Sequence, residues 1–276
     1  MWKENQLDAL LRIAISAGKE ILSVYNAAGD IDVTIKDDNS PLTEADRRAH
    51  NLIEAELQKL TPDIPILSEE SDETAVEERR GWSQFWIVDP LDGTKEFIKR
   101  NGEFTVNIAL VNNGVPELGV VHVPVTGMNY LGQLGTGAWK VDSLGEFQEI
   151  ATPKFRPGEQ AVRVVASRSH RGELVDRLIT AMEAELGNTE VVSMGSSLKI
   201  CLLAEGKADI YPRLAPTSEW DTAAAHAVLA AAGGEIYDTS FESLRYNQKD
   251  SLLNPHFIAV ADTHYDWRSQ LLPSLE

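Results

Sequence analysis

The sequence predicts a mixed α/β fold in which the first half of the chain carries an antiparallel sheet. Three patterns lead to this prediction: two amphipathic helical stripes near the start, several strands joined by turns in the middle, and alternating strands and helices towards the end. A chain of 276 residues with 43% hydrophobic residues can bury a large core. It can do so as one α/β unit or as two closely packed halves.

The first half begins with two predicted helices separated by a short strand. Apolar residues recur at spacings of three and four over residues 7–22, and Gly29 can end this helix. Residues 31–36 alternate as a half-buried strand does. A Ser-Pro-Leu-Thr segment then provides start signals for a second amphipathic helix over residues 40–60.

Several strands follow, and the turns between them predict antiparallel pairing. Residues 71–83 are acidic and polar, which predicts an exposed loop before the strand at residues 85–89. Residues 105–124 predict two strands joined by a turn, and residues 127–141 continue in the same manner. The first half therefore ends near Thr152.

The second half changes to a regular alternation of strands and helices. Strands are predicted at residues 161–167, 189–194, 208–213, 235–238 and 256–262, and helices at residues 174–186, 195–206 and 221–233. Such alternation implies crossover connections and layered sheets. No repeat or low-complexity linker is visible, so we expect an α+β half at residues 1–153 and an α/β half at residues 154–276 that share an interface and together form the site.

Charge and composition exclude several classes of protein. The formal net charge of −18 argues against a nucleic-acid polymer or an anionic membrane surface as a partner. No stretch reaches the roughly 18 consecutive apolar residues of a membrane-spanning helix, and the start lacks an export signal. We therefore expect a soluble, cytoplasmic protein without an integral membrane segment; peripheral association with the inner membrane is left open. Cys201 is the single cysteine and lies among apolar residues, which indicates a core position.

Acidic residues gather where predicted strands end. Asp89 and Asp92 follow a strand in WIVDPLDGTKEF, Glu69 and Glu70 follow the apolar run at residues 64–67, and Asp221 opens a helix. Two carboxylates three residues apart repel each other, so a cation is expected beside them. Hard oxygen ligands suit Mg²⁺ or Mn²⁺ and not zinc, because no Cys or His stands nearby in ligand spacing. Two or three ions could share these groups, with the backbone carbonyl of Leu91 as a neutral ligand.

Neighbouring residues are consistent with catalysis at such a centre. The hydroxyl of Thr94 could hold a water molecule, and Asp46 could accept or orient the proton of that hydroxyl. Each motif also has a purely structural alternative: DPLDG as an ordinary turn, the acidic pair at residues 69–70 as a solvated loop, and Thr43 with Asp46 as the cap of their helix. The occurrence of all the motifs at strand ends favours the metal site.

These motifs resemble the metal-dependent, lithium-sensitive phosphomonoesterase superfamily that includes inositol monophosphatase and fructose-1,6-bisphosphatase. WIVDPLDGTKEF is similar to its aspartate-rich signature, LSEES to its upstream glutamate element, and EWDTAAAHAVLAAAGG to its C-terminal signature. The resemblance covers essentially the whole chain and implies a layered α/β/α/β/α sandwich, the inositol monophosphatase-like fold. The ending TKEF is similar to the 3′(2′),5′-bisphosphate nucleotidase branch of bacterial sulfur assimilation, where inositol phosphatases usually read TTNF.

The resemblance also implies roles for individual residues. The metal ligands would be Glu69, Asp89, the Leu91 carbonyl, Asp92 and Asp221, with Glu70 less certain. The scissile phosphate would contact Gly93 and Thr94, and Thr94 assisted by Asp46 would position the attacking water. The nucleotide would be held by Ser196, Lys199, Arg213 and His170, which match GSSLK, YPR and SRSH. The alternative for the last three is an ordinary surface charge or loop histidine.

The implied reaction is hydrolysis of 3′-phosphoadenosine 5′-phosphate to AMP and phosphate, with Mg²⁺ activating water and neutralising the phosphoryl oxygens. Such ions would also let an acidic protein accept an anionic small molecule. One alternative is an inositol or sugar phosphatase of the same superfamily, which would share every metal ligand. A second is a catalytically silent metal-binding or interaction protein, which predicts a broken ligand set. The resemblance allows a monomer or a homodimer.

Overall fold

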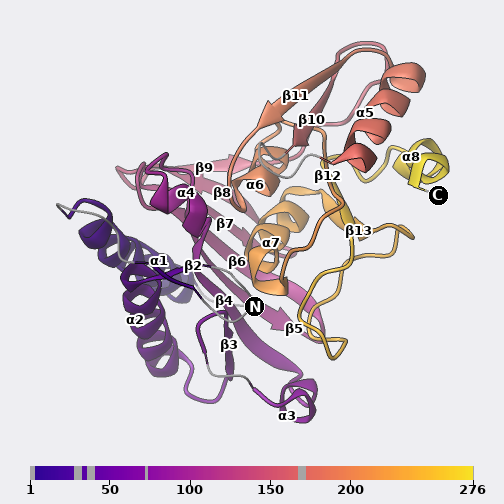
Figure 1. Cartoon of the computed structure of the whole chain (residues 1–276). Helices are drawn as coiled ribbons and strands as arrows, with labels where there is room; N and C mark the ends of the chain where they lie inside the picture. Colours follow the sequence, from indigo (N-terminus) through magenta and orange to yellow (C-terminus); the bar gives the residue numbers. More distant parts are fainter. Residues whose placement is uncertain (1–3, 28–32, 36–40, 72–73, 167–171, 276) are drawn as a thin grey trace.

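The computed structural model describes residues 4–27, 33–35, 41–71, 74–166 and 172–275. Within these residues the chain forms five layers in the order helix, sheet, helix, sheet, helix, which can be followed across Figure 1. Three hydrophobic cores lie between the layers, and the central helices share one core with both sheets. The predicted α/β/α/β/α sandwich is therefore confirmed.

The first helix layer consists of α1 (Glu4–Tyr25) and α2 (Glu44–Leu60), which cover one face of the larger sheet. Each helix buries a stripe of small and aliphatic side chains at spacings of three and four. The stripes contain Leu10, Ala14, Ala17 and Ile21 on α1, and Ala45, Ala49, Ile53 and Leu57 on α2. The first predicted helix is thus present and longer at both ends, while Gly29 lies outside the described residues.

The larger sheet has seven strands in the order of the chain. Its strands are β3 (Ile66–Ser68), β4 (Gln84–Asp92), β5 (Thr105–Asn112), β6 (Val115–Val123), β7 (Met128–Gln133), β8 (Gly137–Val141) and β9 (Phe147–Ile150). Neighbours pair antiparallel except β3 and β4, which are parallel. On β4, Trp86 and Val88 face α1 and α2, whereas Phe85 and Ile87 face the central helices.

The central helix layer consists of α6 (Leu198–Ala204) and α7 (Ala223–Ala232). Both helices are buried on most sides, and Cys201 on α6 is fully buried, as predicted. The backbone of α7 lies directly on β6, because a Cβ atom added at Gly119 would stand 2.2 Å from the carbonyl oxygen of Ala224. The small residues of α7 therefore set how closely this helix approaches the sheet.

The second sheet has five strands in the order β11-β10-β12-β14-β13. Its strands are β10 (Val162–Ala166), β11 (Thr189–Ser193), β12 (Ile210–Arg213), β13 (Glu235–Asp238) and β14 (Phe257–Val260). The parallel pairs β10–β11 and β10–β12 confirm the predicted crossovers. The outer helices α5 (Glu173–Leu186) and α8 (Trp267–Leu275) cover the far face. Neither α8 nor β9 was predicted.

Two predictions about the first half are wrong. Residues 71–83 are not simply an exposed loop, because they contain α3 (Val76–Arg80), where Arg79 is only 2% exposed. Residues 33–35 form β1 (Val33–Ile35), which is exposed instead of half-buried. Among the described residues it pairs with β2 (Pro41–Thr43) in a two-stranded ribbon that is separate from both larger sheets.

The division into residues 1–153 and 154–276 stays a prediction. None of the described helices is both long and apolar enough to cross a membrane.

Candidate active site

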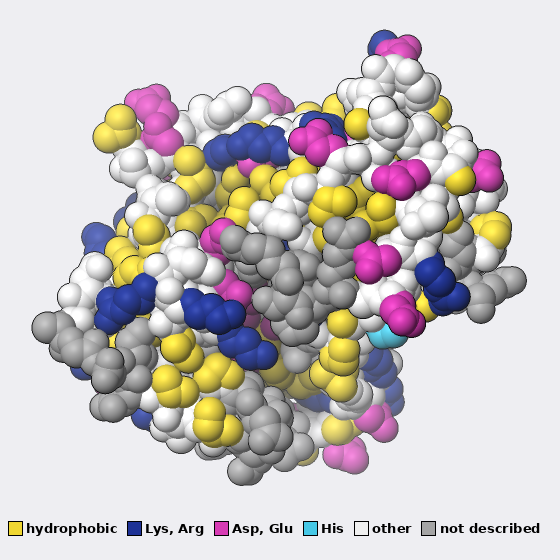
Figure 2. Space-filling model, turned by 45° about the horizontal axis from the view of Figure 1, so that its top comes forward, with side chains coloured by type: hydrophobic (Ala, Val, Ile, Leu, Met, Phe, Trp, Pro, Cys, Tyr) yellow, Lys and Arg dark blue, Asp and Glu magenta, His cyan; other side chains and the backbone are white. Residues whose placement is uncertain are grey.

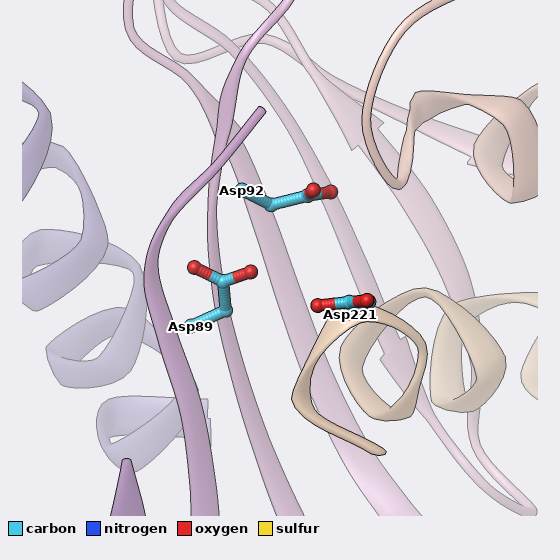
Figure 3. Close-up of side chains that lie close together, drawn as sticks. All are labelled: Asp89, Asp92 and Asp221. Atoms are coloured by element: carbon cyan, nitrogen blue, oxygen red, sulfur yellow. The ribbon is translucent and has the colours of Figure 1, made fainter. Parts of the chain in front are cut away.

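Asp89 and Asp92 lie at the end of β4, where an irregularity in strand pairing turns both to one face. Asp89 pairs with Asn107 and Asp92 pairs with Thr105, so three steps along β4 match two steps along β5. Side chains three residues apart on a regular strand point to opposite faces. The extra residue of a bulge brings the two side chains to the same face. Leu91 accordingly packs in the core under α1 and α2, while the carboxylates of Asp89 and Asp92 lie close to each other and to Asp221 (Figure 3).

Asp221 completes the cluster from the other half of the chain. It ends the short 3₁₀ turn η1 (Glu219–Asp221), which leads into α7. One oxygen each from Asp89, Asp92 and Asp221 lies within 4.8 Å of the others (Figure 3). The Ser218 N–H donates to Asp221 Oδ2 at 2.8 Å, and the Leu91 N–H donates to Asp89 Oδ1 at 3.0 Å, so backbone amides fix two of the carboxylates. The predicted convergence of these aspartates is confirmed.

The electrostatics of this cluster indicate a need for cations. Burial raises the pKa of Asp221 to about 8, and the charges of Asp92 and Glu69 add to the effect. Burial also raises the pKa of Asp89 well above its usual range, and the next contributions are the charges of Glu69 and Asp92. The pKa of Asp92 is raised by burial although Lys199 opposes the shift. An all-oxygen donor set whose charges repel each other fits hard divalent cations.

The upstream glutamates lie beside this cluster. Glu69 directly follows β3 and donates its N–H to the carbonyl of Val88 at 3.1 Å. Its charge raises the pKa of Asp89 and Asp221, but its carboxylate is not among the three that converge within 4.8 Å. Glu70 is half-buried, and its charge acts on Asp46. The ligand role of Glu69 stays a prediction.

Thr94 and Asp46 have separate hydrogen-bond partners. Gly93 has a φ of 92°, which ends the strand and starts α4 (Thr94–Ile98). Thr94 donates its hydroxyl hydrogen to the Leu91 carbonyl at 3.4 Å. Asp46 instead accepts from the hydroxyl and N–H of Thr43 at 2.5 and 2.7 Å, in the capping box of α2. The capping role of Asp46 is confirmed, and its catalytic role stays a prediction.

A cleft opens beside the cluster and collects most of the predicted substrate-binding residues. Its lining includes Asp92, Gly93, Ser196, Lys199, Arg213 and Asp221. Asp89 and the Leu91 side chain are almost completely buried behind it, in the sheet. His170 lies outside the described residues, so its predicted contact with the nucleotide is not addressed.

Two of the basic residues that line the cleft, Lys199 and Arg213, form no salt bridge in the described part of the chain, although the charge of Asp92 acts on Lys199. The Lys199 ammonium lies over the Tyr211 ring at 5.8 Å, and burial lowers its pKa; within the described contacts it forms no ion pair. Arg213 donates from Nη2 to the Pro216 carbonyl at 3.1 Å, while its buried Nε has no hydrogen-bond partner in the described part of the chain. Lys199 and Arg213 can therefore bind an anion.

On the face shown in Figure 2, acidic side chains are scattered and Lys and Arg form only small groups.

Comparison with known proteins places this geometry in a family. The family model described as the inositol monophosphatase family matches residues 2–274. The chain belongs to the inositol monophosphatase family. It is 49% identical to the 3′(2′),5′-bisphosphate nucleotidase CysQ of Escherichia coli K12 over 251 residues, which cover 91% of this chain and 98% of that protein. It is 38% identical to CysQ of Haemophilus influenzae, covering 96% of each.

Solved structures of inositol monophosphatase family members agree with the fold. The crystal structure of CysQ from Bacteroides thetaiotaomicron matches with a TM-score of 0.82 and 46% identity, covering 94% of this chain and 98% of that one. An inositol monophosphatase from Thermotoga maritima matches with a TM-score of 0.76 at 23% identity, covering 98% and 96%, which supports the fold alone. The inositol monophosphatase family is metal-dependent, and the aspartate cluster of this chain fits that property.

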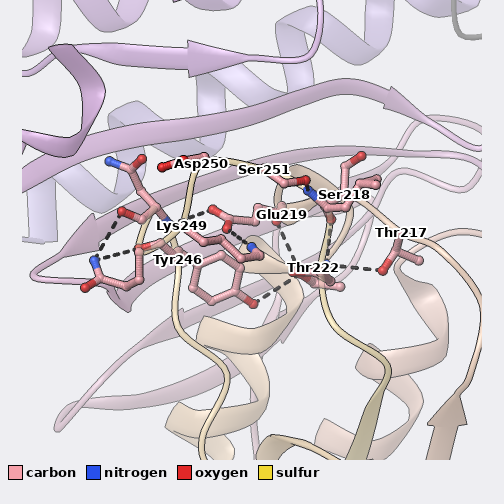
Figure 4. A network of polar contacts seen from close by, with 12 residues as sticks. Thr217, Ser218, Glu219, Thr222, Tyr246, Lys249, Asp250 and Ser251 are labelled. Carbon is pink, nitrogen blue, oxygen red and sulfur yellow. Dashed lines mark hydrogen bonds and ion pairs between the residues drawn. The ribbon is translucent and has the colours of Figure 1, made fainter. Parts of the chain in front are cut away.

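A buried polar network supports the turn that carries Asp221 (Figure 4), and the sequence reasoning missed it. Glu219 is fully buried; it accepts from the ammonium of Lys249 at 2.5 Å and from the N–H of Asn247 at 2.6 Å. Arg79 donates to Asn247 Oδ1 at 2.5 Å and to the Asp250 carbonyl. The network thus joins α3 and the loop around residue 249 to the Asp221 turn. The only signal in the sequence was the charge of Glu219 next to an apolar Trp.

Proposed function

We propose that this chain is a Mg²⁺-dependent 3′(2′),5′-bisphosphate nucleotidase that hydrolyses 3′-phosphoadenosine 5′-phosphate to AMP and phosphate. The observation that carries the proposal is the position of Lys199 and Arg213, which line the same cleft as Asp92 and Asp221 and form no salt bridge among the described residues. The acidic cluster would bind one phosphate through metal ions, and the side chains of Lys199 and Arg213 would bind a second phosphate. The names of the relatives at 38–49% identity support the same substrate class.

Asp89, Asp92 and Asp221 would hold the ions, with Glu69 and the Leu91 carbonyl as further ligands. We propose two or three Mg²⁺ ions, with Mn²⁺ as a substitute. Bound ions would supply a lowered pKa of the attacking water and would neutralise the phosphoryl oxygens. The protein's own contribution is a rigid donor set on β4 and η1, fixed by backbone amides before substrate arrives.

Thr94 is our candidate for orienting the attacking water. Its hydroxyl hydrogen is directed to the Leu91 carbonyl, so the hydroxyl oxygen is left to accept a hydrogen bond. A water that donates to this oxygen would turn its lone pairs away from Thr94 and towards the phosphorus. Asp46 would act only indirectly, by fixing the start of α2 through Thr43.

A substrate panel tests the proposal directly. Phosphate release would be measured for 3′-phosphoadenosine 5′-phosphate, inositol 1-phosphate and fructose 1,6-bisphosphate, each with Mg²⁺ and with EDTA. We expect the bisphosphate nucleotide to give the highest kcat/KM and EDTA to abolish its turnover. Preferred turnover of inositol 1-phosphate would instead support the inositol phosphatase alternative. Turnover of none of them would favour a catalytically silent protein.

The variant Lys199→Met tests the role of the second phosphate. We expect a 10- to 100-fold rise in KM for 3′-phosphoadenosine 5′-phosphate, since a charge-assisted contact contributes about 1.5–3 kcal/mol. The same variant should turn over 3′-AMP, which lacks the 5′-phosphate, almost as well as the unchanged chain does. Lys59→Met, at a largely exposed lysine in an ion pair on α2, is the control. Equal losses for both nucleotides would contradict the assignment of Lys199.

The variant Asp92→Asn tests the acidic cluster. It keeps the shape of the side chain and removes one of the converging charges. We expect phosphate release in the presence of Mg²⁺ to fall by a factor of about 100 or more, because the ions lose a ligand. Asp63→Asn, at an exposed aspartate, is the control. Activity of Asp92→Asn near that of the unchanged chain would remove Asp92 from the mechanism.

A further inference from the structure

We propose that Asn107 is a positioning residue that fixes the carboxylate of Asp92 for cation binding. Asn107 lies on β5, directly opposite Asp89 in the strand pairing, and is 1% exposed. A buried amide in the middle of a sheet is costly unless its hydrogen bonds are satisfied. Its partners all belong to the candidate site, and the proposed function as described above assigns it no role.

Two contacts converge on the same oxygen of Asp92. The N–H of Ser197, at the start of α6, donates to Asp92 Oδ2 at 2.5 Å. The amide nitrogen of Asn107 lies 3.5 Å from the same Oδ2. In the described part of the chain, Asp92 Oδ1 has no hydrogen-bond donor, so it is the oxygen left for a cation.

Asn107 also contacts Ser197, whose N–H makes the shorter of the two hydrogen bonds to Asp92. The hydroxyl of Ser197 lies 2.8 Å from Asn107 Oδ1 and 2.9 Å from the hydroxyl of Thr105. Thr105, Asn107 and Ser197 are each at most 3% exposed. A single amide therefore bridges the Asp92 carboxylate on β4 and the turn that precedes Lys199 in the cleft.

The chemistry of the four side chains fixes the direction of every hydrogen bond in this series. An ionised carboxylate only accepts, so the NH₂ group of Asn107 must face Asp92 and its carbonyl must face Ser197. The single hydroxyl hydrogen of Ser197 is then directed to Asn107, and Thr105 must donate to Ser197. The resulting order, Thr105 to Ser197 to Asn107 to Asp92, has no freedom to reverse while Asp92 is charged.

This arrangement has a consequence for metal binding. Residues that hydrogen-bond to a metal ligand set its orientation, and their removal typically weakens metal affinity by about 10- to 100-fold. Asn107 does this for Asp92 in two ways, directly through its NH₂ group and indirectly through Ser197. Because the same turn contributes Ser196 to the cleft, Asn107 also links the geometry of the cation site to that of the substrate pocket.

Mn²⁺ binding to the substrate-free protein tests the inference without reference to catalysis. Isothermal titration would compare the unchanged chain with Asn107→Ala, Ser197→Ala and Asn129→Ala. Asn129 is the matched control: it is also 1% exposed in the same sheet, but its amide contacts His122 Nδ1 at 2.7 Å and the Gly127 carbonyl at 2.9 Å. Thermal denaturation of each metal-free variant would report the cost to stability.

We expect Asn107→Ala to weaken Mn²⁺ binding about tenfold or more, the range for removing a partner of a metal ligand. Ser197→Ala, which keeps the backbone N–H, should weaken it by a smaller factor. Asn129→Ala should lose thermal stability but bind Mn²⁺ within about twofold of the unchanged chain, since distant sites behave independently.

Two results would overturn the inference. One is a folded Asn107→Ala variant with unchanged Mn²⁺ affinity, and the other is an equal loss of affinity in Asn129→Ala. If Asn107→Ala does not fold, Ser197→Ala decides alone, and unchanged affinity in it contradicts the inference. The inference rests on the metal centre of the proposed function, but separate experiments refute the role of Asn107 and the proposed function. A chain that releases no phosphate from the bisphosphate nucleotide would refute the function and leave the Mn²⁺ comparison intact.

Discussion

Removing the charge of Lys249 should destabilise the protein far more than removing that of a comparable surface lysine. Lys249 and Glu219 form an ion pair of 2.5 Å in which the carboxylate side chain is fully buried and the lysine is 38% exposed. Lys59 and Glu56 form a pair of nearly equal length, 2.6 Å, with exposures of 71% and 45%. The variants Lys249→Met and Lys59→Met therefore change the same type of bond in two different environments.

The expected magnitudes follow from burial. Breaking a buried pair leaves an uncompensated charge and costs about 3–5 kcal/mol, whereas an exposed pair contributes about 0–1 kcal/mol. Because water reaches the Lys249 ammonium, and because the Asn247 N–H still donates to Glu219, we expect a cost of about 2–3 kcal/mol for Lys249→Met. In a domain of this size that corresponds to a fall in Tm of about 5–10 °C.

Thermal denaturation in a metal-free buffer at pH 7 measures both variants. The double variant Lys249→Met with Glu219→Gln should recover part of the loss, since no buried charge then remains unpaired. Equal and small shifts for Lys249→Met and Lys59→Met would refute the reasoning. They would show that Glu219 does not depend on Lys249, and the network in Figure 4 would then not support the Asp221 turn through this pair.

Three further outcomes are expected. The pKa of Asp221 rises from 3.8 to about 8 in the folded state, so the metal-free folded protein retains a proton that the unfolded chain releases. The Tm of the metal-free protein should therefore fall as pH rises from about 4 to about 8, and Mn²⁺ should remove this fall. Gly119→Ala should cost about 1–3 kcal/mol by pushing α7 off β6, while Gly172→Ala, at an open position, should change the Tm little. Phosphate release should decrease with LiCl and not with equal NaCl, as the family resemblance implies.

The sequence was sufficient to predict the elements that carry strong periodicity. The stripes of α1 and α2 follow from residue spacing alone, because burial of one face imposes a period. The strands β4 to β7 are buried on both faces and read as apolar runs between turns. The aspartate cluster was also predictable, since Asp89, Asp92 and Asp221 stand at strand and helix ends. What the residues alone could not give was the number of layers, because layer order depends on contacts between distant segments.

The remaining features depend on single long-range contacts that leave no pattern. Arg79 lies in an acidic, polar segment that predicts a loop, yet its guanidinium is buried by acceptors about 170 positions further along the chain. Asn107 occupies a buried position in an apolar strand, and only the bulge in β4 explains why an amide is needed there. Asp46 stands three residues after Thr43, which is the spacing of a capping box, but spacing could not show whether it contacts Thr43 or the distant Thr94.

The candidate site joins segments that lie far apart in the sequence. β4 contributes Asp89 and Asp92, the turn before α7 contributes Asp221, and the start of α6 holds Asp92 through the Ser197 N–H. Without cations, burial and mutual repulsion disfavour the charged forms of these carboxylates and raise the pKa of Asp89 and of Asp221. A divalent ion bound there would reverse the sign of that interaction, and because the unfolded chain has no such cluster, its binding free energy would add to stability. Ions that bind as proposed would therefore also strengthen the packing of α7 against the larger sheet.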